Sequence, residues 1–131
     1  MTSYSEARKR IVSMVPDLKG WRMFRDGLAI GGSPPWIVVG LNPDSTLRGE
    51  ALNATACSGS LDIRVVGESQ LGIGIACEKL QQALDGAYPG SGFSRLIPDK
   101  DSGIFASELE SQSTSRPFMM RVLTWRVSWE V

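Results

Sequence analysis

The change of hydrophobic period within residues 60–86 (SLDIRVVGESQLGIGIACEKLQQALDG) constrains the fold more than any other feature. Leu61, Ile63 and Val65 alternate with polar neighbours, which is the pattern of a half-buried strand. From Ile73 onward the apolar residues recur at helical spacing. The pattern therefore predicts a strand followed by an amphipathic helix, and the apolar side of that helix needs a sheet to pack on.

Capping signals mark the ends of this helix and of a second one. Ser69 can accept hydrogen bonds from the first free N–H groups, and Gly86 can adopt the left-handed conformation that ends a helix. Near the N-terminus, residues 3–15 begin with the capping box S-x-x-E, which includes Glu6, and Pro16 stops the pattern. Two helices are therefore expected.

Other segments have the composition of strands. Trp36–Leu41 is a continuous apolar run, typical of a central strand. Residues 122–131 alternate strictly, so one side is wholly apolar and the strand should pair near the middle of the sheet. Shorter strands are expected at residues 21–25, 93–97 and 104–109.

Three polar segments separate these strands. Asn42–Asn53 begins with an Asn-Pro turn signal and is expected to be an exposed loop or a projecting hairpin that folding does not need. Asp99–Gly103 is expected to be a polar turn, and residues 110–116 a polar loop.

The periodicities also predict the core. Its expected members are Ile37, Val39, Ile63, Val65, Ile73, Cys77, Leu80, Leu84, Leu123 and Val127. We therefore expect one α+β domain over residues 1–131, with a mixed or mainly antiparallel sheet and two helices packed on it. A chain of 131 residues is long enough to bury roughly two-thirds of the surface that it would expose when unfolded.

The composition, 42% apolar and 21% charged, is ordinary for a globular protein. No apolar run approaches the ~20 residues of a membrane span, and no signal-peptide pattern opens the chain, so a soluble protein made in a cytoplasm is expected. Cys57 and Cys77 would allow one disulfide, but reduced thiols are favoured because nothing suggests secretion.

The charge is balanced as a whole but uneven along the chain. The formal net charge is zero, which gives no general basic footprint for nucleic acid. Met1–Arg25 carries a net charge of +4 and the remainder −4. Arg8, Lys9 and Arg10 lie together on the first helix, where a solvated face is the simpler interpretation.

Few residues suggest chemistry. The sequence has no histidine, which removes Ser-His and Cys-His nucleophiles and histidine metal sites. Gly67, Gly72 and Gly74 lie between the strand and the helix but match neither G-x-x-x-x-G-K-[ST] nor G-x-G-x-x-G, so turn and packing roles are favoured.

Acidic residues give equally weak signals. Asp99, Asp101 and Glu110 copy three positions of a calcium loop, but Ile104 stands where that loop requires glycine. Glu108 and Glu110 share one side of a predicted strand, as the acid and base of a hydrolase would, but exposed acidic residues often do so.

The tryptophans Trp21, Trp36, Trp125 and Trp129 would suit base stacking, but without an interleaved basic stripe a core or subunit contact is favoured. No catalytic residue, metal site or cofactor is predicted, which favours a protein that works by assembling.

The order of these elements resembles a family. A helix, a Pro-led apolar strand (SPPWIVVG), a strand-helix unit (LDIRVVGESQLGIGIACEKLQQALDG) and a closing alternating strand (FMMRVLTWRVSWEV) together look like the tail terminator or tail completion proteins of long-tailed bacteriophages. The resemblance implies a non-catalytic subunit of a ring, expected to be a hexamer, that caps the tail tube, ends its polymerisation and docks it to the head connector.

Partners implied by the resemblance are further copies of the chain, the tail tube protein and the connector or stopper protein, with no membrane and no sequence-specific nucleic acid. The protein would be assembled in the host cytoplasm and reside in the tail or neck of the virion. Charged residues expected at its assembly interfaces are Arg8, Lys9, Arg10, Asp44, Arg48, Glu50, Asp99, Asp101, Glu108 and Glu110.

Two alternatives stay open. One is another neck or head-completion protein. The other, from a different class, is a small-ligand-binding domain or histidine-free enzyme that uses a pocket beyond the carboxyl end of Asp62–Val66.

Overall fold

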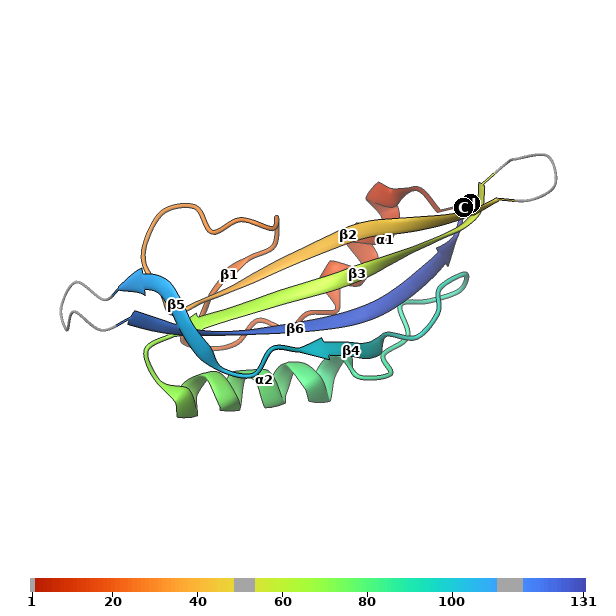
Figure 1. Cartoon of the computed structure of the whole chain (residues 1–131). Helices are drawn as coiled ribbons and strands as arrows, with labels where there is room; N and C mark the ends of the chain where they lie inside the picture. Colours follow the sequence, from red (N-terminus) through yellow and green to blue (C-terminus); the bar gives the residue numbers. More distant parts are fainter. Residues whose placement is uncertain (1, 49–53, 111–116) are drawn as a thin grey trace.

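The computed structural model describes residues 2–48, 54–110 and 117–131, and these form a six-stranded sheet with two helices (Figure 1). The elements along the chain are α1 (Tyr4–Ser13), β1 (Arg22–Phe24), β2 (Trp36–Arg48), β3 (Ala54–Gly67), α2 (Gln70–Leu84), β4 (Ile97–Asp101), β5 (Phe105–Glu110) and β6 (Pro117–Glu130).

The sheet has the strand order β1-β2-β3-β6-β4, and β5 also pairs with β6. The β1–β2 pair is parallel, and every other strand pair within the described residues is antiparallel. This confirms the α+β fold, with a mixed sheet that is mostly antiparallel. The long alternating strand β6 lies between β3 on one side and β4 and β5 on the other, as its pattern predicted.

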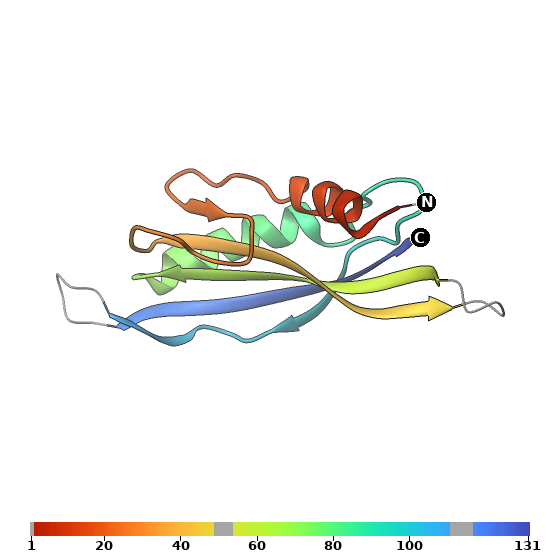
Figure 2. The ribbon, with the colours of Figure 1, turned by 90° about the horizontal axis from the view of Figure 1, so that it is seen from above.

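Both helices pack on the same face of the sheet (Figure 2). The Ser3 hydroxyl accepts from Glu6 N at 3.2 Å at the start of α1, and the Ser69 hydroxyl accepts from Gly72 N at 3.1 Å at the start of α2. Gly86, just after α2, has a φ of 71°, a conformation that costs glycine nothing. The capping signals therefore placed both helices correctly.

The core lies between the helices and the sheet. All ten residues predicted for it are buried there, together with others such as Leu61, Trp125 and Trp129. Trp125 donates its indole N–H to Asp85 Oδ1 at 2.7 Å, so the polar atom of this large buried side chain has a partner.

The prediction of a loop for Asn42–Asn53 was wrong, and the alternative of a projecting hairpin is correct for its described part. β2 continues through Pro43 to Arg48 and pairs with β3. Pro43 stands opposite Gly59, and the register shifts between Pro43 and Ser45. Such a bulge lets a strand accommodate a proline that cannot donate to the ladder. Residues 49–53 lie outside the described residues.

The turn predicted for Asp99–Gly103 was also wrong in part, because Ile97–Asp101 forms β4, which pairs with β6. The strand predicted at 93–97 begins only at Ile97, and Phe93 forms an isolated bridge with Trp129. The strand at 104–109 is confirmed as β5. Of the predicted loop, residues 111–116 lie outside the described residues.

The edge of β2 is protected although β1 covers only its first residues. β1 pairs with Trp36–Val38. Beyond that, Gly27 N donates to Val39 O at 2.9 Å, and the Tyr4 hydroxyl donates to Leu41 O at 2.7 Å. In the part of the chain that the structure describes, neither helix has the length and apolar character needed to cross a membrane.

Candidate functional site

The sheet has a second face, opposite the helices, which we call the open face. Alternation along β3 directs Leu61, Ile63 and Val65 into the core, and therefore Asp62, Arg64 and Val66 toward the open face. Val66 is nevertheless buried without belonging to the core cluster. Other parts of the chain must therefore cover this face in places.

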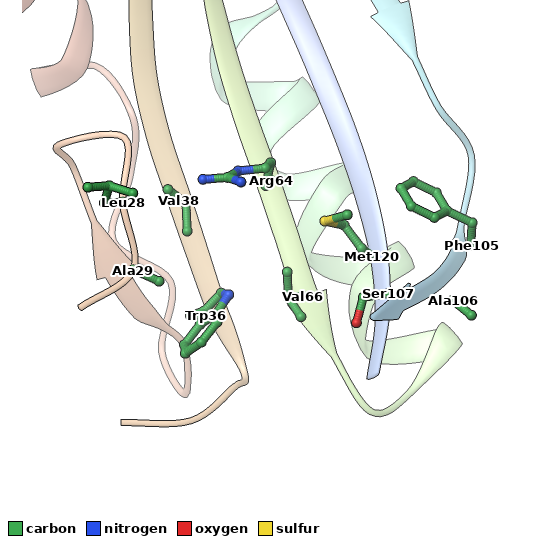
Figure 3. A pocket seen from close by; sticks show the side chains of 10 residues that line it. All are labelled: Leu28, Ala29, Trp36, Val38, Arg64, Val66, Phe105, Ala106, Ser107 and Met120. Carbon is green, nitrogen blue, oxygen red and sulfur yellow. The ribbon is translucent and has the colours of Figure 1, made fainter. Parts of the chain in front are cut away.

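These parts leave a groove of about 550 Å³ between them (Figure 3). Its floor comes from β2, β3 and β6, one wall from the loop after β1, and the other wall from β5. The lining residues are Leu28, Ala29, Trp36, Val38, Arg64, Val66, Phe105, Ala106, Ser107 and Met120. The volume is within the usual range of ligand and side-chain pockets.

Arg64 is the charged residue among those that line this groove. Its Nη2 donates to Gly27 O at 2.9 Å, which ties the side chain to the loop. A guanidinium has five N–H donors, so others stay available to a bound group. The groove therefore suits apolar side chains accompanied by a carboxylate.

The other end of the open face is polar and acidic. Asp62 accepts from Asn42 Nδ2 and from the Ser60 hydroxyl, each at 2.6 Å. Asp44 accepts from both terminal nitrogens of Arg126, one of them at 3.1 Å. The hydrogen bond to Asp44 raises the pKa of Arg126, and the nearby carboxylates of Asp99 and Asp62 raise it further. Carboxylates therefore outnumber the cation around Arg126.

The three basic residues predicted at interfaces on α1 differ in their contacts within the chain. Arg8 donates to Arg25 O and pairs with Asp26 at 3.1 Å. The Arg10 guanidinium lies 5.7 Å from the centroid of the Phe93 ring. Lys9 is exposed and is the one of the three best placed to meet a partner.

The acidic residues predicted at interfaces do not gather at one site. Asp44 is on the open face, whereas Asp101 receives two hydrogen bonds from Arg121, at 2.9 and 2.5 Å. Asp99 is exposed in β4. Arg48, Glu108 and Glu110 lie in strands but their side chains lie outside the description, as does all of Glu50. Their interface role stays a prediction.

A smaller hollow of about 280 Å³ lies beyond the end of β3, where the ligand-binding alternative placed its pocket. Its lining includes Trp21, Gly67 and Ser69. Among the described residues, no group of three or more Cys, Asp or Glu is arranged to hold a metal ion. Cys57 and Cys77 are both free thiols. Burial raises the pKa of the Cys77 thiol to about 11, so it is protonated at neutral pH.

Sequence reasoning missed the groove. Of its lining, Trp36 was considered for base stacking and, in preference, for core or subunit contact, and Arg64 only as the polar neighbour in an alternating strand. A signal was present in β2 and β3, because Val38 and Val66 are apolar at positions that face away from the helices. Such residues need another covering surface.

Two ion pairs should make the stability sensitive to acid. The hydrogen bond from Arg126 lowers the pKa of Asp44, and the hydrogen bond from Arg121 lowers that of Asp101, each from 3.8. A lowered folded-state pKa gives stability that is present above the unfolded pKa and is lost as pH falls through the folded value. We expect the urea concentration at the unfolding midpoint to decrease when the pH is lowered below about 4. The decrease should be smaller in Asp44→Asn and in Asp101→Asn. Equal acid dependence in all three proteins would contradict this assignment.

Compared with models of known protein families, the sequence matches none, and a comparison with curated proteins gives no significant match either.

Proposed function

We propose that this protein is a tail terminator of a long-tailed bacteriophage. Copies of the chain form a ring, expected to be a hexamer, on the last ring of the tail tube. The ring ends tube polymerisation and offers the head connector or stopper protein a docking surface. The protein is then a structural part of the virion neck, assembled in the host cytoplasm, and needs no catalytic site or cofactor.

The partly uncovered open face is the observation that carries this proposal. The helices cover one face of the sheet, and the groove interrupts the cover on the other. In the lining of the groove, Leu28 is 64% exposed and Phe105 41%. Clustered exposed apolar side chains on a soluble protein mark interaction sites.

The shape of the subunit also supports the proposal. The β2–β3 and β5–β6 hairpins extend from opposite ends of an elongated sheet (Figure 1). A ring between a tube and a connector needs two surfaces that face opposite ways. The long paired strands give both ends a rigid support.

The proposal is tested by the mass of the purified protein, by negative-stain images of the protein with tail tubes, and by deleting the gene in its phage. Rings on tube ends, and tails of uncontrolled length in the deletion, are expected. Tails of normal length that fail to join heads would favour another neck protein. A monomer that never caps tubes and binds a small molecule in the groove would favour the ligand-binding alternative.

Assembly should be slowed by salt. The N-terminal segment carries +4 and the remainder −4, and the open face has an acidic end around Asp44 and Asp99. Opposite charges on the two surfaces of a head-to-tail contact speed association more than they tighten it. The association rate in stopped-flow light scattering should fall as salt rises past about 0.15 M, where the Debye length is ~8 Å. An association rate that does not depend on salt would mean that apolar contacts, and not opposite charges, drive assembly.

A further inference from the structure

A second exposed apolar surface lies on α2. Leu71 is 73% exposed and Ile75 is 48% exposed, although the helix is otherwise amphipathic. They are four residues apart, so they are neighbours on one side of the helix. Glu78 and Gln82, both exposed, continue the same row at helical spacing. We call these four residues the α2 stripe.

The α2 stripe and the groove lie on opposite sides of the molecule. α2 buries Ile73, Cys77 and Leu80 against the sheet, so the stripe faces away from the sheet. The groove lies on the other side of that sheet, with the helix behind it (Figure 3). Neither surface can cover the other within one chain.

We infer that the α2 stripe of one copy docks in the groove of the next copy. This rests on the proposed function, because it states which surfaces join the subunits of the ring. Leu71 and Ile75 would lie against apolar residues of the groove such as Phe105 and Trp36, and Glu78 would meet Arg64. An amphipathic helix that places side chains three and four apart in an apolar groove is a common mode of recognition.

The chemistry favours a second copy as the occupant. Arg64 is the charged residue of the groove lining, and Glu78 is the charged member of the α2 stripe, so the charges are complementary. Burying Arg64 without an anion would be costly. The exposed apolar side chains of the α2 stripe and of the groove are both uncovered within one chain, and each surface could cover the other between two copies.

The positions of the two surfaces suit a ring. Gly67 ends β3 and α2 begins at Gln70, so Leu71 lies near the same end of the sheet as Val66 in the groove. One copy can therefore stack on the next so that the helices of the first lie against the open face of the second, with the same ends of the two sheets aligned. When the α2 stripe of one copy binds the groove of another, the pair still has one free stripe and one free groove. Further copies can add in the same way, and a ring closes when the rotation between neighbouring copies allows it.

Charge reversal tests the contact. Sedimentation velocity of the full chain up to about 1 mM should show self-association, and Arg64→Glu or Glu78→Arg should each weaken it about tenfold or more. The combined Arg64→Glu/Glu78→Arg variant should recover most of the loss. Lys79→Glu, a charge reversal beside the stripe, is the matched control and should change little. Far-UV circular dichroism and thermal midpoints check that each variant is folded.

Disulfide trapping detects the contact even when it is short-lived. In a Cys57→Ser background, copies with Leu71→Cys are mixed with differently tagged copies carrying Ala106→Cys in the groove. A mixed disulfide should form faster than with Ala83→Cys, which places the thiol elsewhere on α2. Lack of the mixed disulfide, or charge reversals that leave association unchanged, would overturn the inference. Trapping together with normal tail lengths in phage with the Arg64→Glu substitution would instead overturn the proposed function and leave the contact standing.

Discussion

Replacing Leu80 with alanine should lower the free energy of unfolding by about 2–5 kcal/mol. Leu80 is fully buried on the side of α2 that packs against the sheet. Truncation removes apolar contacts and leaves a cavity, because the packed surroundings relax only partially. Urea denaturation of the purified protein measures the change, provided that the slope with denaturant is unchanged.

Lys79→Ala is the matched control. Lys79 is the preceding residue and is exposed, and alanine is a good helix former, so the change should be within about 0.5 kcal/mol. A loss at Leu80 as small as that at Lys79 would mean that α2 presents another side to the sheet.

Shortening the β2–β3 hairpin should leave the subunit folded and, if the protein is the proposed tail terminator, disturb the phage tail. Thr46 stands directly opposite Cys57, so residues 47–56 can be replaced by Asn-Gly, which suits a two-residue hairpin turn. Of the replaced residues whose side chains the structure describes, Thr55 is exposed and Ala56 is half-buried, so the thermal midpoint should stay within a few degrees. If this hairpin meets the tube, phage with the change should make tails of uncontrolled length.

The β5–β6 hairpin provides the comparison at the other end of the sheet. Glu110 stands opposite Pro117, so Asn-Gly can replace residues 111–116 in the same way. If this end meets the connector, tails should keep their length but fail to join heads. If the two variants show the opposite defects, the β5–β6 hairpin faces the tube and the β2–β3 hairpin faces the connector. Normal tail lengths and normal infectivity with both hairpins shortened would exclude these ends as contact surfaces.

The parts of the fold that sequence predicted are those that local rules determine. The change of period in residues 60–86 requires a strand and then a helix. The hydroxyls of Ser3 and Ser69 accept hydrogen bonds where the two helices begin, and Gly86 adopts the left-handed conformation just after the second helix ends. Strict alternation in β6 predicted which residues enter the core, because a strand turns every second side chain to the same face.

The errors arose where tertiary pairing overrides a local signal. Asn42-Pro43 usually starts a turn, yet β3 is long enough to keep pairing with β2 past the proline by means of a bulge. β4 contains Pro98 and three charged residues, but its place beside the central strand β6 draws it into the sheet. Local composition carries no information about such a neighbour.

The groove could not be predicted because register assembles it. Its floor takes alternate residues from β2, β3 and β6, and its walls come from a loop and from β5. Likewise, Asp44 and Arg126 are 82 residues apart in sequence and meet only through the β2–β3 and β3–β6 pairings. The exposed row of Leu71 and Ile75 was readable from the spacing of α2, but only the structure identifies a surface that complements it.

The protected margin of β2 has a consequence for how free subunits behave in a crowded cell. A bare strand margin is a template for backbone pairing with another chain and can seed amyloid-like fibres. Here the carbonyls of Val39 and Leu41 already accept hydrogen bonds from Gly27 and Tyr4, and Pro43 has no N–H to offer. Strand addition is therefore blocked along this stretch. Fibre growth through this part of the β2 edge is therefore prevented, while contacts through side chains of the open face stay possible.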